Sequence, residues 1–217
     1  MSHDDFEVES TPGLPADLPQ GERLLWQGVP KWKSLAIHAY HVRKVALYFL
    51  FLVLWRAGAG VINGQGFEAI ALACGFMALL GAIAVGVLCL LAYASTRATI
   101  YSVTTRRVLI RHGVAVQMTL NIPFRFIESA GLRLYSDGTG DISLGIDRKE
   151  RIGYLITWPH LRAWQLTRPQ PSFRSLADSR EAADLLSAAL AAEAGAAPVR
   201  MDYEAAPSLG PRTAAAA

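Results

Sequence analysis

The chain has 217 residues, of which 52% are hydrophobic and 18% are charged. Soluble domains usually carry about a quarter charged residues, and the deficit here is concentrated between Lys44 and Ser95. A membrane region therefore explains the composition better than an unusual soluble core does. The formal net charge of +3 is small, and bases beside membrane helices are expected from topology alone. The charge thus gives no reason to expect a nucleic-acid partner.

The first 43 residues divide into two stretches of different composition. Residues 1–20 are acidic and contain three prolines, which is typical of a flexible arm. Residues 21–43 combine Trp and Tyr with Lys and Arg, and these residue types favour the level of the lipid headgroups. We predict an interfacial lead-in over residues 21–43, helical from about Ser34.

Two apolar runs predict a transmembrane helical hairpin over residues 44–94. The first run, Lys44 to Ile62, has about 19 residues, enough to cross a bilayer. Arg56 interrupts it, and we expect its side chain either to snorkel outward or to pair with an acidic group such as Glu68. The second run, Phe67 to Ala94, has about 28 residues, so it must tilt or extend past the membrane.

Small residues recur every four positions along the second run. Such a stripe lets helix backbones approach closely in lipid, against the first helix or a partner chain. The alternative is that Gly and Ala are simply common in membrane helices. The predicted helix-contact residues are Cys74, Ala78, Ala82 and Gly86.

The flanks of the two runs predict the topology. Lys and Arg precede the first run and follow the second, whereas the turn between them, residues 63–66, has neither. The positive-inside rule then places both termini in the cytoplasm.

Residues 96–192 change from helical to strand-like periodicity. Short alternating segments separated by turn residues predict a small β-barrel or sandwich. A final amphipathic helix is expected after Asp178, its N-cap, with Glu181 positioned as in a capping box. We expect the Ala- and Pro-rich tail, residues 193–217, to be disordered. The predicted strands are 98–103, 107–112, 114–121, 126–135, 141–146 and 153–158.

No arrangement of reactive side chains predicts catalysis, a metal site or a cofactor. None of the five histidines lies in either apolar run, whereas a haem-ligating subunit usually needs an imidazole at membrane depth. Gly138-Thr139-Gly140 fits a hairpin turn better than a dinucleotide loop, because the third glycine is missing. The bases Arg106, Arg107 and Arg111 either line a solvated strand edge or contact anionic headgroups at the membrane surface.

Several short motifs resemble those of bacterial pleckstrin-homology-like membrane proteins. The resemblance extends over about residues 13–192, and it implies an α+β fold, a small β-barrel or sandwich capped by a C-terminal helix. The family often has Asp where this chain has Thr105. The motifs are Gly21-Glu22-x-x-Leu25-Trp26-x-Gly28-x-Pro30, Tyr101-x-x-Thr104-x-Arg106-Arg107, Ile122-Pro123 and Gly138-x-Gly140-Asp141-Ile142.

A narrower motif, residues 158–164, is similar to that of photosynthetic complex assembly proteins of purple bacteria, although Ala163 stands where a proline is expected. This resemblance implies a non-catalytic, self-associating factor in the cytoplasmic or intracytoplasmic membrane. Its partners would be subunits of the reaction centre and of the core light-harvesting complex, together with membrane lipid. The domain-surface residues expected to meet them are Trp158, His160, Arg162 and Trp164.

Two other functions remain open from the sequence. One is a membrane-anchored lipid- or protein-binding module unrelated to photosynthesis, since a pleckstrin-like fold alone does not fix function. The other is a membrane enzyme, which would need a convergent polar pocket, and the sequence offers no candidate for one.

Overall fold

A computed structural model describes residue 14 and residues 18–146, 159–160, 170–195 and 202–204. The chain forms two compact units. The helical unit comprises residues 32–97. The β-unit comprises the residues up to Lys31 together with those from Ala98 onward.

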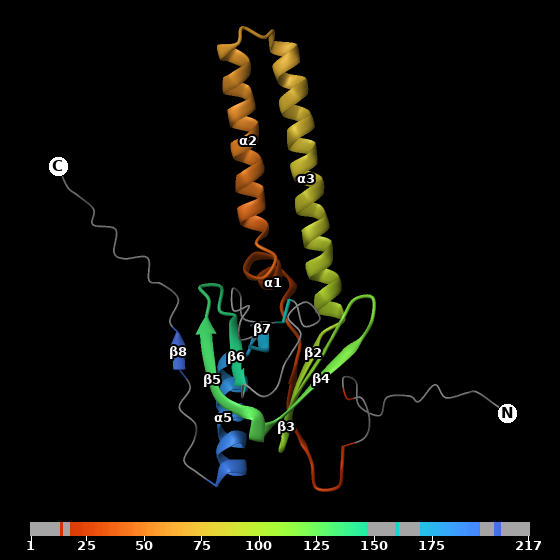
Figure 1. Cartoon of the computed structure of the whole chain (residues 1–217), viewed down its shortest axis with the longest axis vertical. Coiled ribbons are helices and arrows are strands. Elements are labelled where there is room, and N and C mark those ends of the chain that lie inside the picture. The colour runs from red at the N-terminus through yellow and green to blue at the C-terminus, as the bar shows by residue number, and fades with distance from the viewer. Residues whose placement is uncertain (1–13, 15–17, 147–158, 161–169, 196–201, 205–217) are drawn as a thin grey trace, which may run out of the picture. The chain divides into compact units, whose positions relative to one another are not determined.

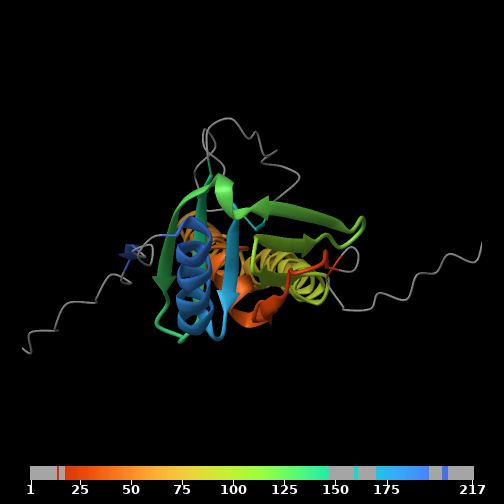
Figure 2. The same cartoon turned by 90° about the horizontal axis from the view of Figure 1, so that it is seen from below.

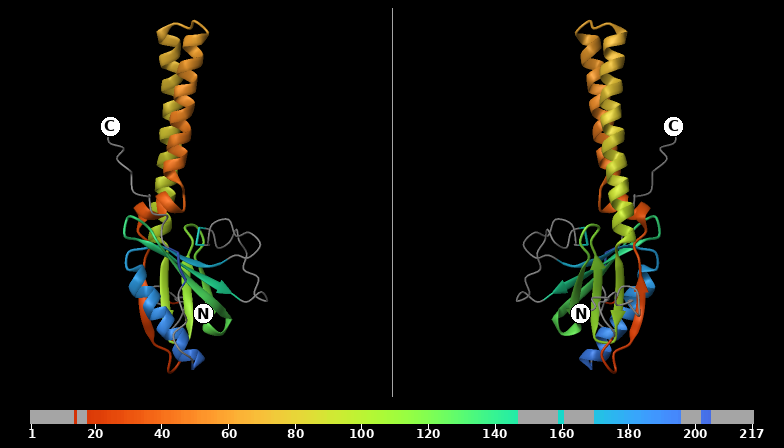
Figure 3. Two further views of the ribbon diagram at one scale, coloured as in Figure 1. Left: turned by 90° about the vertical axis from the view of Figure 1, so that its left-hand side faces the viewer. Right: turned by 90° about the vertical axis from the view of Figure 1, so that its right-hand side faces the viewer.

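The helical unit consists of a short helix followed by a long antiparallel pair. These are α1 (Trp32–His38), α2 (Val42–Ile62) and α3 (Phe67–Arg97). Helices α2 and α3 run side by side along the hairpin (Figures 1 and 3). Both are long and apolar enough to cross a membrane, so the predicted hairpin is present.

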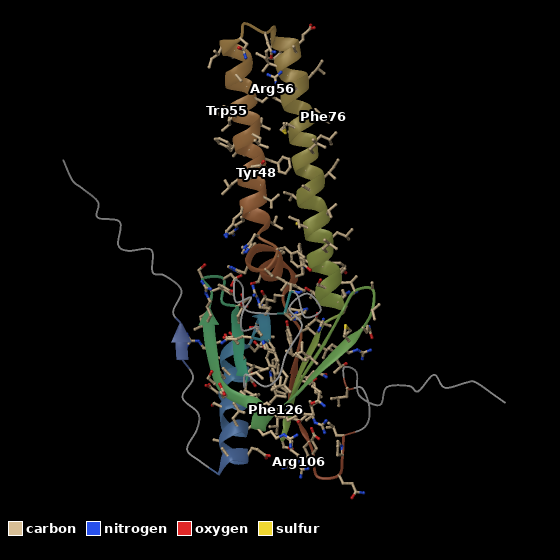
Figure 4. The ribbon with its side chains drawn as sticks, in the orientation of Figure 1. Tyr48, Trp55, Arg56, Phe76, Arg106 and Phe126 are labelled. Carbon is tan, nitrogen blue, oxygen red and sulfur yellow. The ribbon has the colours of Figure 1, made fainter. Side chains whose placement is uncertain are left out.

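The surface of this hairpin is apolar. Tyr48, Trp55 and Phe76 are 58%, 68% and 63% exposed, and Figure 4 shows their side chains along the two long helices. In water, so large an apolar surface would favour aggregation. In a bilayer the same surface meets lipid tails, so the two helices are suited to association with a membrane.

The β-unit contains two mainly antiparallel sheets that enclose one core. In the described residues, the first sheet has the order β1-β2-β3-β4 and the second β7-β6-β5-β8, the last strand being parallel to β5. Helix α5 (Ser179–Ala194) packs against the second sheet (Figure 2). The strands are β1 (Leu24–Gly28), β2 (Ile100–Thr104), β3 (Arg107–His112), β4 (Met118–Pro123), β5 (Ile127–Leu134), β6 (Gly140–Ile146), β7 (Ser172–Leu176) and β8 (Asp202–Glu204), with a 3-10 turn, η1 (Phe124–Phe126), before β5.

Aromatic side chains join the two sheets in the core. Tyr101 of β2 stacks on Phe173 of β7, with ring centroids 4.7 Å apart. Trp26 of β1 also stacks on Phe173, with ring centroids 6.0 Å apart. Both Tyr101 and Phe173 are fully buried, and Leu186 from α5 closes the cluster. The predicted fold class is therefore confirmed: a hairpin of two apolar helices and a small β-structure capped by a C-terminal helix.

The boundary predicted before this β-structure is wrong, because the unit begins much earlier in the chain. Residues 24–28, assigned to an interfacial lead-in, form β1, which pairs with β2 through Trp26–Val103 and Gly28–Tyr101. In the order of the chain, the helical unit is thus inserted between β1 and β2, which pair with each other in the first sheet. A strand of five residues gives little periodicity, and its partner lies beyond the whole hairpin.

Most of the remaining strands start or end within a few residues of their predicted positions. β4 is shorter than predicted, because residues 113–117 form an exposed loop that turns at Gly113, where φ is +117°. β7 and β8 were not predicted, and β8 lies in the tail expected to be disordered. The strand predicted over 153–158 lies outside the described residues. Asp178 is the N-cap of α5 as predicted, but its side chain makes no capping hydrogen bond.

Candidate functional site

The predicted small-residue stripe of α3 does not face α2 as a whole. The Cys74 thiol lies 3.7 Å from the Val53 carbonyl oxygen of α2, but Ala78, Ala82 and Gly86 are exposed. For these three residues a contact with the first helix is wrong, while a contact with a partner chain stays a prediction. The close approach occurs instead at Gly81, where an added Cβ would lie 2.8 Å from Phe49 Cβ.

Gly81→Leu should therefore loosen the hairpin, since overpacking of this kind costs about 1–3 kcal/mol. In a Cys89→Ala background, a Val53→Cys substitution should form a disulfide with native Cys74 under mild oxidation. We expect Gly81→Leu to slow this cross-link about tenfold. Gly86→Leu is the matched control and should leave the rate unchanged, because nothing lies within 4 Å of a Cβ at that position. Equal rates in the two variants would contradict the packing described.

Arg56 reaches toward the turn of the hairpin. Its Nη1 donates to Gln65 Oε1 at 2.9 Å, and Figure 4 shows Arg56 near the closed end of the helix pair. The polar group thus extends toward the end of the apolar span, as the snorkelling alternative predicted. The Arg56 guanidinium thus binds Gln65 in the turn, three residues before Glu68.

The three bases predicted at the membrane surface occupy three different environments. Arg107 forms a bidentate pair with Glu22: its Nε donates to Oε1 at 2.8 Å and its Nη2 to Oε2 at 2.6 Å. The Glu22 side chain is fully buried. The Arg107 hydrogen bond holds the pKa of Glu22 below its usual value, although burial opposes this shift. The prediction that Arg107 serves lipid is therefore wrong, since its guanidinium binds within the fold.

Arg106 and Arg111 lie near opposite ends of β3. Arg106 is exposed in the β2–β3 turn, and Figure 4 shows it at the end of the β-unit where Phe126 lies. Arg111 is near the other end of the strand and donates to the Gln117 side chain. Four residue steps separate Arg107 from Arg111, about 13–14 Å along a strand. The bases therefore do not form one patch.

A buried ion pair lies between β6 and β7. Arg174 Nε is 3.0 Å from Asp141 Oδ2, and both side chains are almost fully buried. The Tyr135 hydroxyl donates to the same oxygen at 2.5 Å, and the Ser175 N–H donates to Asp141 Oδ1 at 2.8 Å. Ser175 has a positive φ of 53°, and its carbonyl accepts the Lys31 N–H at 2.8 Å. Asp141 thus positions Ser175 of β7, and the Ser175 carbonyl in turn binds Lys31 in the segment that follows β1.

His160 extends this polar region into the core. It is 1% exposed, so the prediction that it lies on the domain surface is wrong. Its Nδ1 is 2.7 Å from the Tyr101 hydroxyl and its Nε2 is 3.1 Å from the Thr99 hydroxyl. The His112 ring centroid lies 5.3 Å away. The other predicted surface residues, Trp158, Arg162 and Trp164, lie outside the described residues.

The hydrogen bonds favour one tautomer of His160. The Tyr101 oxygen already accepts the Arg174 N–H at 3.0 Å, and burial raises the pKa of Tyr101, so its hydroxyl keeps its proton. The Tyr101 hydroxyl therefore donates its proton to His160 Nδ1, and His160 Nε2 carries the ring proton and donates it to Thr99. Burial, and then the charges of His112 and Arg174, lower the pKa of His160 to about 3, so the ring is neutral near pH 7.

The buried polar region is suited to holding the fold rather than to chemistry. Its side chains are paired mainly with one another and with the backbone, and they come from β2, β3, β6 and β7 and from Thr99, Tyr135 and His160 outside the strands. In the described part of the chain, no group of three or more His, Cys, Asp or Glu could hold a metal ion. Sequence reasoning missed the cluster because bonds that join its strands connect residues 34 and 73 positions apart, and no single motif contains both partners.

Comparison with known proteins places the chain in a family. Residues 45–190 match the bacterial PH domain family. The chain is also 39% identical over 194 residues, 89% of its length and 91% of the relative's, to the "Uncharacterized 23.7 kDa protein in puhA 5'region" of Rhodobacter capsulatus. No solved structure gives a significant match. The chain belongs to the bacterial PH domain family, and its structure extends the domain back to β1.

Proposed function

We propose that this protein is a non-catalytic assembly factor for the photosynthetic reaction centre and core light-harvesting complex of a purple bacterium. Two findings support the proposal. The 39% identical relative is named for its position in the puhA 5' region of Rhodobacter capsulatus, and residues 158–164 resemble photosynthetic complex assembly proteins. The relative gives the stronger support for a photosynthetic role, because the fold alone is compatible with many functions.

The proposed location is the cytoplasmic or intracytoplasmic membrane, crossed twice, with both termini in the cytoplasm. The apolar exteriors of α2 and α3 support the crossing, and the bases at the two flanks support the orientation. The partners would be nascent reaction-centre and core-antenna subunits, whose apolar helices could pack on the exposed hairpin. A homodimer is part of the proposal, with the exposed face Ala78, Ala82 and Gly86 as its contact in the membrane.

The absence of catalysis is likewise proposed. The polar side chains buried in the described β-unit mainly bind one another, and His160, the one predicted surface residue that the structure describes, binds Tyr101 and Thr99. Trp158, Arg162 and Trp164 remain the candidate client contacts of the β-unit.

A deletion strain tests this proposal. We expect reaction-centre and core-antenna absorbance to fall in the deletion strain and to return when the full chain is restored. In gently solubilised membranes taken during pigment induction, the tagged protein should co-purify with polypeptides of those complexes. Normal pigment–protein levels in the deletion strain would refute the assembly role.

The second candidate function is a membrane-anchored lipid- or protein-binding module, favoured by membership of the bacterial PH domain family. The same purification separates the two. Recovery of the protein with lipid and without photosynthetic polypeptides, from cells that are making pigment, would support the module.

A further inference from the structure

The β3–β4 loop, taken together with Met118 at the start of β4, exposes apolar side chains, whereas surface turns are usually polar. Val114, Val116 and Met118 are 56%, 72% and 43% exposed, and the loop is the green turn between these strands in Figure 1. Gly113, at φ +117°, makes the turn possible, because a Cβ there would clash with the Val116 carbonyl oxygen. The backbone is therefore shaped to present these side chains outward.

The covalent chain keeps this loop near the end of an apolar helix. Only Ala98 and Thr99 separate Arg97, the last residue of α3, from Ile100, the first of β2. Three Cα steps span at most about 11 Å. Ile100 pairs with Arg111, about 5 Å away across an antiparallel pair. Arg111 is thus within about 16 Å of the end of α3, whatever the relative orientation of the two units.

Side chains at the end of α3 mark the headgroup level of a membrane. Trp32 and Tyr93 meet edge to face at 6.4 Å, and they are 39% and 46% exposed. Lys33 lies 5.8 Å from the Trp32 ring, and Arg97 lies 5.7 Å from the Tyr93 ring. Aromatic and basic residues gather at membrane–water boundaries. Helix α3 therefore leaves the hydrocarbon near Tyr93, and the Arg111 end of β3 is within reach of the headgroups.

The two ends of the first sheet differ in chemistry. The end at which β2 begins exposes Val29, Val116 and Met118, with Lys31 and Arg111 beside them. The opposite end, around the β2–β3 turn, exposes Arg23 and Arg106 and a single large apolar side chain among the described residues, Leu25 at 39%. Apolar side chains flanked by bases suit the boundary of an anionic bilayer. If both ends of the sheet faced only water, there would be no reason for apolar side chains to gather at one end.

We propose that the β3–β4 loop inserts Val114, Val116 and Met118 into the interfacial layer of the membrane that α2 and α3 cross, with Arg111 near anionic headgroups. The β-unit is then held on the lipid surface by a second attachment besides its covalent links to the hairpin. The inference rests on the hairpin crossing the membrane, as in the proposed function, and is independent of any photosynthetic client.

Depth-resolved fluorescence quenching tests the insertion in the full chain. In a Cys74→Ala, Cys89→Ala background, single substitutions Val116→Cys, Arg106→Cys and Leu79→Cys carry an environment-sensitive probe. The protein is reconstituted in vesicles of phosphatidylcholine and phosphatidylglycerol, three to one. Nitroxide lipids should quench the probe at 116 at a shallow depth and the probe at 79 at a greater depth. Iodide should quench the probe at 106 several-fold more strongly than the probe at 116.

The other outcomes would contradict either the insertion of the loop or the crossing of the membrane by the hairpin. A probe at 116 that iodide reaches as readily as at 106 would overturn the insertion. A probe at 116 shielded from both iodide and nitroxide lipids would also overturn it, because protein would then cover the loop. Absence of lipid quenching at 79 would mean that the hairpin does not cross the membrane, and the proposed function would fail with it. Omitting phosphatidylglycerol should weaken quenching at 116 and leave 79 unchanged.

Discussion

Replacing Asp141 with asparagine should lower the free energy of unfolding of the β-unit by about 3–5 kcal/mol, the usual cost of leaving one member of a buried ion pair without its partner. The substitution keeps the shape of the side chain and removes its charge. Arg174, which is 5% exposed, then stays in the core without the carboxylate that lies 3.0 Å from its Nε. The effect should be large because solvent has little access to either group.

The hydrogen bonds of Asp141 add to the expected cost. Two donors, the Tyr135 hydroxyl and the Ser175 N–H, point at separate carboxylate oxygens. An asparagine offers one oxygen and one NH₂ group, so one donor would face another donor. Ser175 also needs support for its positive φ, which is uncommon for a residue with a side chain.

Denaturant unfolding of the full chain in detergent micelles measures this effect, with circular dichroism of the aromatic side chains as the signal of the β-unit. Asp137→Asn is the matched control, because Asp137 is exposed and accepts from the Thr139 N–H and hydroxyl in the same hairpin turn. Exposed substitutions usually change stability by about 0.5 kcal/mol or less. Equal midpoints for the two variants would show that Asp141 does not hold the fold.

The hairpin and most strands could be predicted because their signals are local. An apolar run long enough to cross a bilayer needs no knowledge of its neighbours, and the strands of the β-unit alternate within themselves. β1 escaped prediction because it is short and because the residues that identify it as a strand, in β2, lie on the far side of the hairpin. Its pairing is decided by tertiary contacts.

The family motifs turn out to consist of residues that build the fold. Glu22 of the first motif binds Arg107 of the second, and the hairpin separates the two in sequence. The Trp26 ring covers Gly28, where a Cβ would clash with it. Pro30 forms a bridge to Leu176. Such motifs indicate the family reliably, yet they say little about which molecule the protein serves.

Two of the three site predictions that failed did so because sequence does not specify which face of an element meets which neighbour. A four-residue repeat and the 3.6-residue helix turn select slightly different faces, and the face packed on α2 contains Gly81 rather than Gly86. His160 sits in a polar, aromatic motif, which suggested a surface. Its partners, Thr99 and Tyr101, are about 60 positions away, so its burial could not be inferred locally.

Stability of the β-unit should fall as the pH is lowered from about 6.5 toward 5. The pKa of His160 is about 3 in the folded chain, against 6.5 for an ordinary histidine. Between these values the unfolded chain binds a proton that the folded chain does not, so acid favours unfolding. A full proton corresponds to about 1.4 kcal/mol per pH unit, and because the unfolded histidine is only half protonated at pH 6.5, the loss over this interval is about 1.6 kcal/mol.

The groups around His160 act in the same direction. His112, whose own pKa is lowered by burial, and Arg174 both oppose a positive charge on the ring. Glu22, whose folded pKa is lowered, loses its stabilising effect only as the pH falls below about 4.5, so it contributes little above pH 5. The slope between pH 6.5 and 5 therefore isolates the two histidines.

Denaturant midpoints of the full chain in micelles, measured at half-unit steps from pH 7.5 to 5, test the effect. His160→Gln should flatten the slope, because its amide can accept from Tyr101 and donate to Thr99 without titrating. His112→Gln should remove only the smaller share, and the double substitution should abolish the dependence. A slope that His160→Gln leaves intact would mean that the imidazole is protonated in the folded chain. The neutral ring donating to Thr99 and accepting from Tyr101 would then be the wrong description of this core.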